Sequence, residues 1–196
     1  MRNYIITKNK LIINIIDLMS KYGYNGISIR KITKKTNIKE STFYYYFKNK
    51  KSLLDLIINI ANDVLQQKLV LKENKNGYLF LQNSIITLMK IFNDLNFLKI
   101  WRIINIESFN SDIFIKNKFI TSKLYFKKYF KNIILILQSN NLIKNIDSEI
   151  IIEDLYNNII ALLNEFMELK LDEKNTIYIE EKLFQFINYF WNKIKK

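Results

Sequence analysis

Apolar residues recur three and four positions apart along almost the whole chain, which is the spacing of one face of an α-helix. The chain contains no proline and only three glycines, and it shows no sustained alternation of apolar and polar residues. We therefore expect an all-α fold with almost no sheet. The pattern predicts about nine helices, over residues 5–21, 28–36, 39–47, 50–72, 77–95, 97–108, 111–140, 148–170 and 175–195.

The second and third predicted helices are short and lie close together, with turn signals on either side. Ser28 is a good N-cap for the second helix. Asn37 stands where the turn requires a left-handed backbone, a conformation that asparagine tolerates best after glycine. Phe43 and Phe47 are four residues apart and share one buried stripe of the third helix. These features predict a three-helix helix-turn-helix domain, whose second short helix enters the major groove of DNA.

The side of the third helix opposite its phenylalanines carries hydrogen-bonding groups. Ser41, Thr42, Tyr44 and Tyr45 supply the donors and acceptors that reading base edges requires. The alternative is that the tyrosines only pack. Tyr46 fits that alternative best, because it lies three residues after a buried aromatic position.

Positive charge is concentrated in the first quarter of the chain. Residues 1–50 hold 11 Lys or Arg and two acidic residues, whereas residues 51–196 hold 20 and 16, within a net charge of +13. Such an asymmetry favours binding of a polyanion at one end of the molecule. Lys48 lies in a basic linker before the fourth helix, and Lys50 lies at the opening turn of that helix, where free backbone N–H groups add to a phosphate clamp. The alternative is a solvated basic face.

Composition argues against an enzyme. The chain has no cysteine or histidine, which removes disulfides, thiolate metal sites, the commonest metal ligand and the usual proton shuttle. We expect neither metal nor cofactor. A chain of 196 residues with 49% hydrophobic residues is long enough for a proper core. The sequence lacks an apolar run that would span a bilayer and a signal-peptide core, so we expect a cytoplasmic protein.

The motif from Thr42 to Lys50, Thr-Phe-Tyr-Tyr-Tyr-Phe-Lys-Asn-Lys, is followed by Leu53-Leu54 and preceded by a Gly-Tyr pair and a capped helix. In these coupled positions, residues 5–60 resemble the TetR family of bacterial transcriptional regulators. Asn37 departs from the glycine that is usual in the turn of that family.

The resemblance implies a role in DNA binding for specific residues. Tyr44 and Lys50 look like phosphate contacts, Thr42 and Ser41 like groove contacts, and Arg30 like a contact to a base or phosphate. Glu40 either accepts a hydrogen bond from cytosine N4 or only stabilises the positive helix end. The full predicted set is Ser28, Arg30, Lys39, Glu40, Ser41, Thr42, Tyr44, Tyr45, Tyr46, Lys48 and Lys50.

The resemblance also implies two domains, a DNA-binding domain over residues 1–50 and a helical effector-binding and dimerisation domain over residues 51–196, connected by the helix at about 50–72. In the family the last two helices pair with their copies in a partner subunit, and here both carry broad apolar stripes. A homodimer reads a palindromic operator. The predicted interface is Leu155, Ile159, Leu162, Leu163, Phe166, Phe184, Ile187, Phe190 and Trp191.

Aromatic residues are abundant between residues 78 and 130, and most of them are expected to be core. Some are candidates for a pocket that binds a small apolar or aromatic effector: Phe97, Trp101, Arg102, Asn105, Phe126 and Tyr156. The predicted function is a repressor that releases operator DNA when the effector binds. The alternative is a basic helical protein that binds a membrane surface, or DNA without sequence preference, and has no effector.

Overall fold

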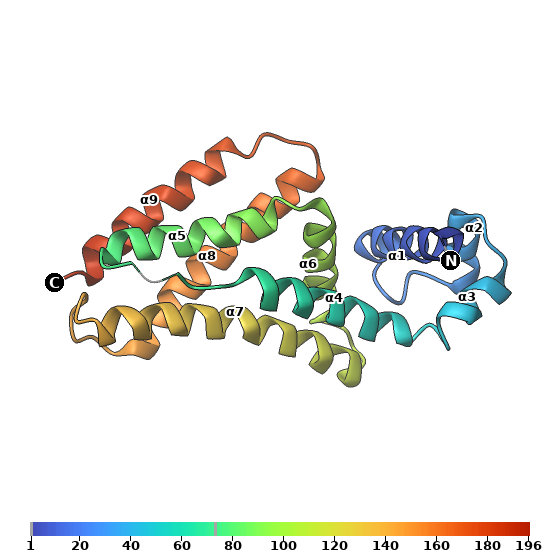
Figure 1. The fold of residues 1–196 in the computed structure, drawn as a ribbon, viewed down its shortest axis with the longest axis horizontal. Coiled ribbons are helices and arrows are strands. Elements are labelled where there is room, and N and C mark those ends of the chain that lie inside the picture. Colours follow the sequence, from blue (N-terminus) through green and yellow to red (C-terminus); the bar gives the residue numbers. More distant parts are fainter. Residues whose placement is uncertain (1, 73) are drawn as a thin grey trace. The chain divides into compact units, whose positions relative to one another are not determined.

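The computed structural model describes residues 2–72 and 74–196, with side chains from residue 8 onward. The described chain folds into nine helices, and its only β-type pairing is an isolated bridge between Ile143 and Lys195. The all-α prediction is therefore confirmed. The helices, labelled in Figure 1, are α1 (Arg2–Tyr22), α2 (Ile29–Thr36), α3 (Glu40–Tyr46), α4 (Ser52–Lys68), α5 (Gly77–Phe92), α6 (Leu95–Glu107), α7 (Ile113–Ser139), α8 (Ser148–Leu171) and α9 (Ile177–Ile194).

The fourth helix is shorter than the sequence predicts at both ends. Its first helical residue is Ser52, and the Ser52 N–H donates to the side-chain oxygen of Asn49 over 3.0 Å, which caps the opening turn. It ends at Lys68 instead of continuing to residue 72.

The chain divides into two compact units. The first comprises the residues up to 63 together with 96–122, and the second comprises residues 64–95 and 123–196. The helix α6 therefore belongs to the same unit as the predicted reading helices, although it follows them by some fifty residues in the sequence. The functional boundary predicted at residue 50 is a different division and stays a prediction.

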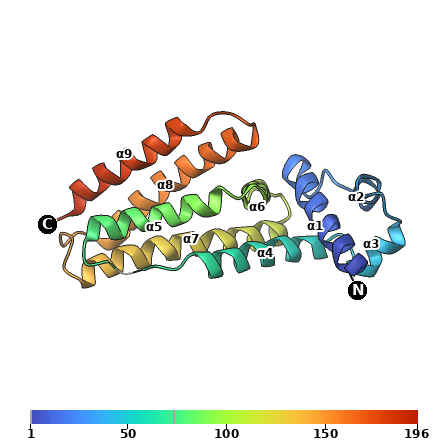
Figure 2. The ribbon, with the colours of Figure 1, turned by 45° about the horizontal axis from the view of Figure 1, so that its top comes forward.

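The core of the first unit lies where α1, α2 and α3 meet. Ile15 and Met19 of α1, Ile32 of α2 and Phe43 of α3 are all fully buried. Figure 2 shows α2 and α3 as two short helices joined by a brief connection beside α1. Burial of these apolar stripes holds the two short helices in place, because helices of this length are unstable on their own.

In the second unit, α5 packs against α8 and α9. Gly77 opens α5 directly against the indole ring of Trp191, and a Cβ at this position would lie only 2.5 Å from a carbon of that ring. The ring of Tyr78 lies 6.3 Å from Trp191 between centroids. Glycine is thus required by a close approach of helix and ring.

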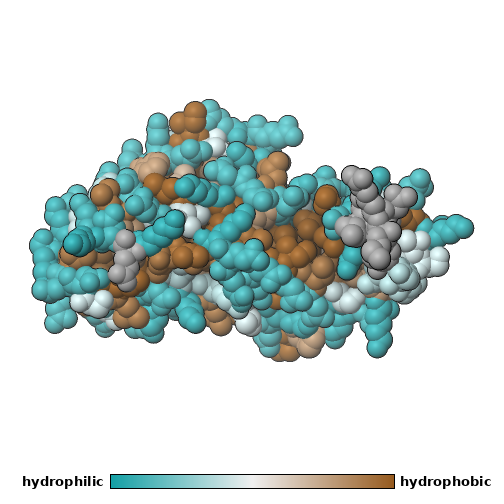
Figure 3. Space-filling model, viewed as in Figure 1, coloured by the Kyte–Doolittle hydropathy of each residue, from teal (hydrophilic) through white to brown (hydrophobic). Residues whose placement is uncertain are grey.

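Hydrophilic residues cover most of the visible face in Figure 3, as expected for helices whose apolar stripes face inward.

Candidate nucleic-acid interface

The two ends of α2 are fixed by side-chain and backbone capping. The Ser28 hydroxyl accepts a hydrogen bond from the Lys31 N–H over 3.1 Å. At the other end Asn37 has φ 55° and ψ 46°, and its N–H donates to Lys34 O while the Ile38 N–H donates to Thr33 O. This pair of hydrogen bonds is a Schellman motif. The left-handed turn predicted at Asn37 is therefore present, and it sets the angle between α2 and α3.

We expect substitutions of Asn37 to change stability according to backbone preference. Asn37→Ala should lower the free energy of unfolding by about 1 kcal/mol, because alanine pays the full cost of the left-handed conformation. Asn37→Gly should leave it unchanged or raise it by a few tenths. Urea denaturation of the three proteins measures the difference. Equal stability of the alanine and glycine variants would show that the turn does not depend on this conformation.

The short helix α3 presents an apolar side to the core and a hydroxyl-bearing side to solvent. Phe43 and Phe47 are buried with ring centroids 5.4 Å apart. Tyr44 and Tyr45 remain 52% and 68% exposed. Tyr46 is half-buried, and its ring packs against those of Tyr45 and Phe47 at 5.2 and 6.5 Å. The described structure therefore leaves the tyrosine hydroxyl side of α3 available to a ligand, except where Tyr46 packs.

The polar residues that the sequence assigns to DNA contact lie at the surface of the first unit. In the first turn of α3, Glu40 is exposed and Thr42 is half-exposed. Ser28 is exposed too, but its hydroxyl already caps α2. The exposed members of the predicted set are Ser28, Arg30, Lys39, Glu40, Ser41, Tyr44, Tyr45 and Lys48, while Thr42, Tyr46 and Lys50 are half-exposed. These positions are compatible with contact to DNA, and their individual roles stay predictions.

Lys50 has neighbours that the sequence does not indicate. Its ammonium group lies over the ring of Tyr24 at 4.1 Å from the centroid. Burial lowers the pKa of Lys50, and the negative charge of Glu107 works in the opposite direction. Burial also raises the pKa of Tyr24, with Asp112 and Glu107 adding to the effect. A phosphate that binds Lys50 would therefore share the ammonium group with an aromatic ring and a nearby carboxylate.

Glu107, at the end of α6, connects that helix to the turn between α1 and α2. Its side chain is only 2% exposed. The Tyr24 N–H donates to Glu107 Oε1 over 2.6 Å, and the Asn110 side-chain amide donates to Glu107 Oε2 over 2.5 Å. Gly23, with φ +65°, allows the approach, since a Cβ there would lie 3.1 Å from Oε1. The local sequence around Glu107 does not indicate this structural role, because its partner Tyr24 lies 83 residues away in the chain.

A second polar connection within the first unit is centred on Asp17 of α1. Its carboxylate binds Lys35 of α2 and, over 2.9 Å, Lys99 of α6. Burial alone would raise the pKa of Asp17, but hydrogen bonds and positive charge from Lys35 and Lys99 outweigh burial and lower the pKa to about 2. The Asp17 carboxylate thus joins α1, α2 and α6. The helices α2 and α3, which form the predicted helix-turn-helix, are called the reading pair below.

We expect the contribution of Asp17 to stability to disappear in acid. Because its folded pKa lies below the ordinary value of 3.8, the carboxylate stabilises the fold above about pH 4, and this stabilisation is lost as the pH falls towards about 2. Thermal unfolding of the parent and of Asp17→Asn between about pH 6 and about pH 2 should show a difference in Tm that shrinks in acid. The exposed Asp63→Asn is the matched control. A difference between parent and Asp17→Asn that is constant with pH would contradict the assignment.

The residues predicted for an effector pocket pack mainly as core. Phe97 and Trp101 of α6 and Phe126 of α7 are buried. The ring of Phe126 contacts that of Phe92 at 6.1 Å, and the ring of Tyr156 contacts that of Phe130 at 5.8 Å. Burial raises the pKa of Tyr156. Arg102 and Asn105 are half-buried. For the three buried rings the structure matches the core alternative, and the effector pocket stays a prediction.

Sequence reasoning also missed two polar atoms of the first unit. Asn62 Oδ1 on α4 and Ser122 Oγ on α7 are buried and have no hydrogen-bond partner among the described residues. Buried polar atoms of this kind are usually satisfied by water or by a ligand. No pattern in the sequence identifies them, because both positions read as ordinary helix.

Burial divides the residues predicted to form a dimer interface. Six of them have essentially no exposed surface in the single chain: Leu155, Ile159, Leu163, Phe166, Ile187 and Phe190. Their stripes cover the chain's own core, so in this conformation they cannot contact a partner subunit. Phe184 is 36% exposed, and Leu162 and Trp191 are half-buried, with Trp191 packed against Gly77. Leu162, Phe184 and Trp191 are the members that keep some exposed apolar surface.

The capped pair of short helices, with its buried phenylalanines and exposed hydroxyls, corresponds to a known sequence profile. Residues 15–57 match that of "Bacterial regulatory proteins, tetR family". The helix-turn-helix region of this chain is therefore similar to that family. It is similar to the IcaR protein of Staphylococcus aureus (strain Newman), a "Biofilm operon icaADBC HTH-type negative transcriptional regulator", with 37% identity over 71 residues. That alignment covers 36% of this chain and 38% of IcaR, so it spans well under half of the relative's length.

Two solved structures extend the likeness to the fold. A TetR family transcriptional regulator from Chloroflexus aurantiacus J-10-FL superposes with a TM-score of 0.76 at 14% identity, covering 100% of this chain and 98% of that one. The structure of AibR in complex with isovaleryl coenzyme A and operator DNA gives a TM-score of 0.63 at 13% identity, covering 83% and 86%. At these identities the likeness establishes that this chain shares their fold and nothing further.

No helix among the described residues is both long and apolar enough to cross a membrane.

Proposed function

We propose that this protein is a sequence-specific DNA-binding transcriptional repressor that acts in the cytoplasm, without catalysis. The observation that carries the proposal is the exposed side of α3, where Tyr44 and Tyr45 stay open to solvent above a buried Phe43 and Phe47. Lys39 and Lys48 flank α3 in the sequence and Arg30 lies on α2, and their exposed positive charge suits contact with phosphates flanking the bases. The similarity to a negative regulator over the first part of the chain supports repression.

The proposed repressor is a homodimer. One helix-turn-helix covers a single half-site, and a two-fold dimer places two reading helices on a palindromic operator. The candidate contact surface lies on α8 and α9, where Leu162, Phe186 and Tyr189 line a shallow hollow of about 420 Å³. Tyr189 is 63% exposed in the single chain. An exposed apolar surface of this kind is typical of an interface.

Release from the operator is proposed to follow binding of a small effector, as the sequence predicts. AibR, which shares the fold, has been crystallised with both isovaleryl coenzyme A and operator DNA. In the present chain, α6 connects directly to the turn before α2 through Glu107. A ligand that favours a different position of α6 would therefore shift α2 and α3 between a conformation that binds DNA and one that does not. Each of the two, ligand and DNA, would then lower the affinity of the protein for the other.

Selection of bound fragments from random duplex DNA tests the proposal. We expect enrichment of a sequence with two inverted half-sites about one helical turn apart, because the two reading helices must enter successive major grooves. Recovery of unenriched random fragments would contradict sequence-specific binding and would leave two alternatives, non-specific binding to DNA and binding to a membrane surface. A parallel assay with vesicles containing anionic lipid separates the remaining candidate, since preference for vesicles over any selected duplex would favour binding to a membrane surface.

A further inference from the structure

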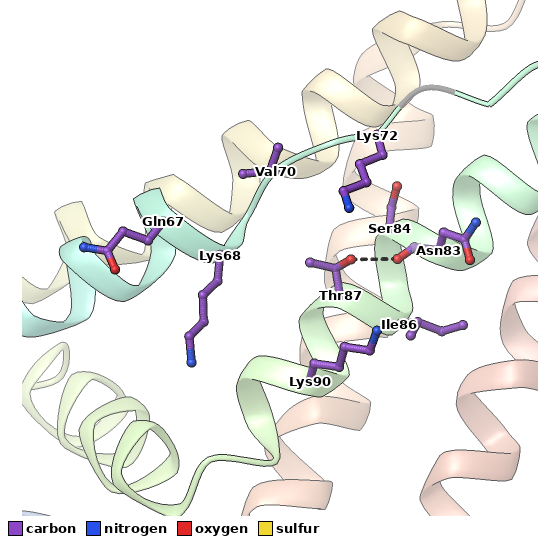
Figure 4. Close-up of a pocket in the computed structure, with 9 residues that line it drawn as sticks. All are labelled: Gln67, Lys68, Val70, Lys72, Asn83, Ser84, Ile86, Thr87 and Lys90. Atoms are coloured by element: carbon purple, nitrogen blue, oxygen red, sulfur yellow. Dashed lines mark hydrogen bonds between the residues drawn. The ribbon is translucent and has the colours of Figure 1, made fainter.

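A basic pocket lies in the second unit, where the end of α4 and the segment after it run beside α5. The pocket encloses about 500 Å³, within the range of small-molecule sites. Three lysines line it: Lys68 at the end of α4, Lys72 four residues further on, and Lys90 near the end of α5. Figure 4 shows the side chains of Lys72 and Lys90 extending toward Thr87 from different elements, whereas Gln67 points away.

The charge of this pocket is not neutralised by the described part of the chain. None of its described lining residues is acidic, and none of the three lysines pairs with a described carboxylate. Other lysines of the same unit are paired, as Lys193 is with Asp154 over 2.7 Å. Bringing like charges together in a concave site is unfavourable unless an anion occupies it.

The remaining lining groups limit what kind of ligand suits the pocket. The hydroxyl hydrogens of Thr87 and Ser84 are already used, donating to Asn83 O over 2.9 Å and to Phe80 O over 2.8 Å. The ammonium groups each offer three donors and no acceptor. The site therefore suits a ligand rich in acceptor oxygens. Val70 and Ile86 add apolar surface to the lining, which suits an organic group attached to the anion.

We propose that this pocket binds the phosphoryl group of a phosphorylated small molecule of nucleotide size. A phosphoryl group carries between one and two negative charges and three acceptor oxygens, and so matches converging lysines better than a single carboxylate does. The ligand would act as the effector of the proposed regulator. Only this regulatory part of the inference rests on the proposed function, because binding itself depends on the pocket alone.

Titration calorimetry of the full chain with ADP tests the site, with adenosine as the uncharged probe and citrate as a carboxylate probe of similar charge. We expect ADP to bind once per chain, citrate to bind at least about tenfold more weakly and adenosine not to bind. Lys72→Gln and Lys90→Gln should each weaken ADP binding about tenfold, as loss of a charged hydrogen bond does. Lys116→Gln, exposed on α7 and outside the pocket, should change nothing.

Several results would overturn the inference. These are absence of ADP binding, equal binding of ADP and citrate, and ADP affinity that the two pocket variants leave unchanged. Weaker DNA binding by the pocket variants in the absence of ADP would assign the lysines to DNA instead. The site and the proposed function can fail separately. Lysine-dependent ADP binding without any selected operator would support the site and contradict the proposed regulator. Operator binding without ADP binding would support the regulator and contradict the site.

Discussion

Replacing Glu107 by alanine is expected to lower the free energy of unfolding by about 3 kcal/mol, the cost typical of removing a buried, charged hydrogen-bond acceptor. The change deprives the Tyr24 N–H and the Asn110 side-chain amide of their acceptor. It also removes the negative charge near the ammonium group of Lys50. Because Tyr24 lies in the turn that leads into α2, operator affinity should fall as well. Chemical denaturation and fluorescence anisotropy with labelled operator measure the two effects.

Two controls separate the role of Glu107 from a general effect of losing a helical glutamate. Glu107→Gln keeps an acceptor for the Tyr24 N–H and should lose about half as much stability as Glu107→Ala, because charged hydrogen bonds are roughly twice as strong as neutral ones. Glu181→Ala removes an exposed glutamate of α9 and should be nearly silent. If Glu107→Ala were as stable as Glu181→Ala, the connection between α6 and the turn would have no energetic importance.

Substitutions on the exposed side of α3 are expected to give the largest loss of DNA recognition without loss of stability. Thr42→Ala should weaken binding to the selected operator about tenfold and relax the preference at one base position, as loss of a base contact does. Tyr44→Phe removes one hydroxyl while keeping the ring against Phe43, whose centroid lies 5.6 Å away. It should weaken binding by a similar factor. Affinity for the operator and for single-base variants of it measures both changes.

Lys48→Ala is the matched comparison for the variants of α3, because it removes a positive charge instead of a base contact. It should weaken binding about equally for all duplexes and reduce the slope of log affinity against log salt concentration by about one. If Thr42→Ala behaved in this uniform way too, the hydroxyl side of α3 would contact only the DNA backbone.

Local features of the reading pair were predictable from the sequence because they depend on neighbouring residues. The left-handed turn follows from the chemistry of Asn37. The buried stripe follows from the four-residue spacing of Phe43 and Phe47, both of which are buried. The number of helices followed from apolar periodicity, whereas the Asn49 cap of α4 is a single hydrogen bond that periodicity does not reveal.

Contacts between distant segments were not predictable in this way. Tyr24 and Glu107 are separated by 83 residues, and nothing in either local sequence indicates that they meet. Apolar stripes have a related ambiguity, since a stripe shows that a helix face is covered but not what covers it. Leu155 and Ile159 were assigned to a partner subunit, yet they are fully buried within their own chain.

The ratio of affinities for the selected operator and for a scrambled duplex of the same length and composition is the most direct test that the exposed side of α3 reads DNA sequence. At physiological salt we expect the parent protein to prefer the operator by about a thousandfold or more, the range of specific DNA-binding proteins. We expect Thr42→Ala, at an expected groove contact, to lower that preference about tenfold while the protein remains folded. We expect Tyr44→Phe, at an expected phosphate contact, to weaken binding to both duplexes alike. A ratio near one for the parent protein, or a ratio that Thr42→Ala leaves unchanged, would contradict the account.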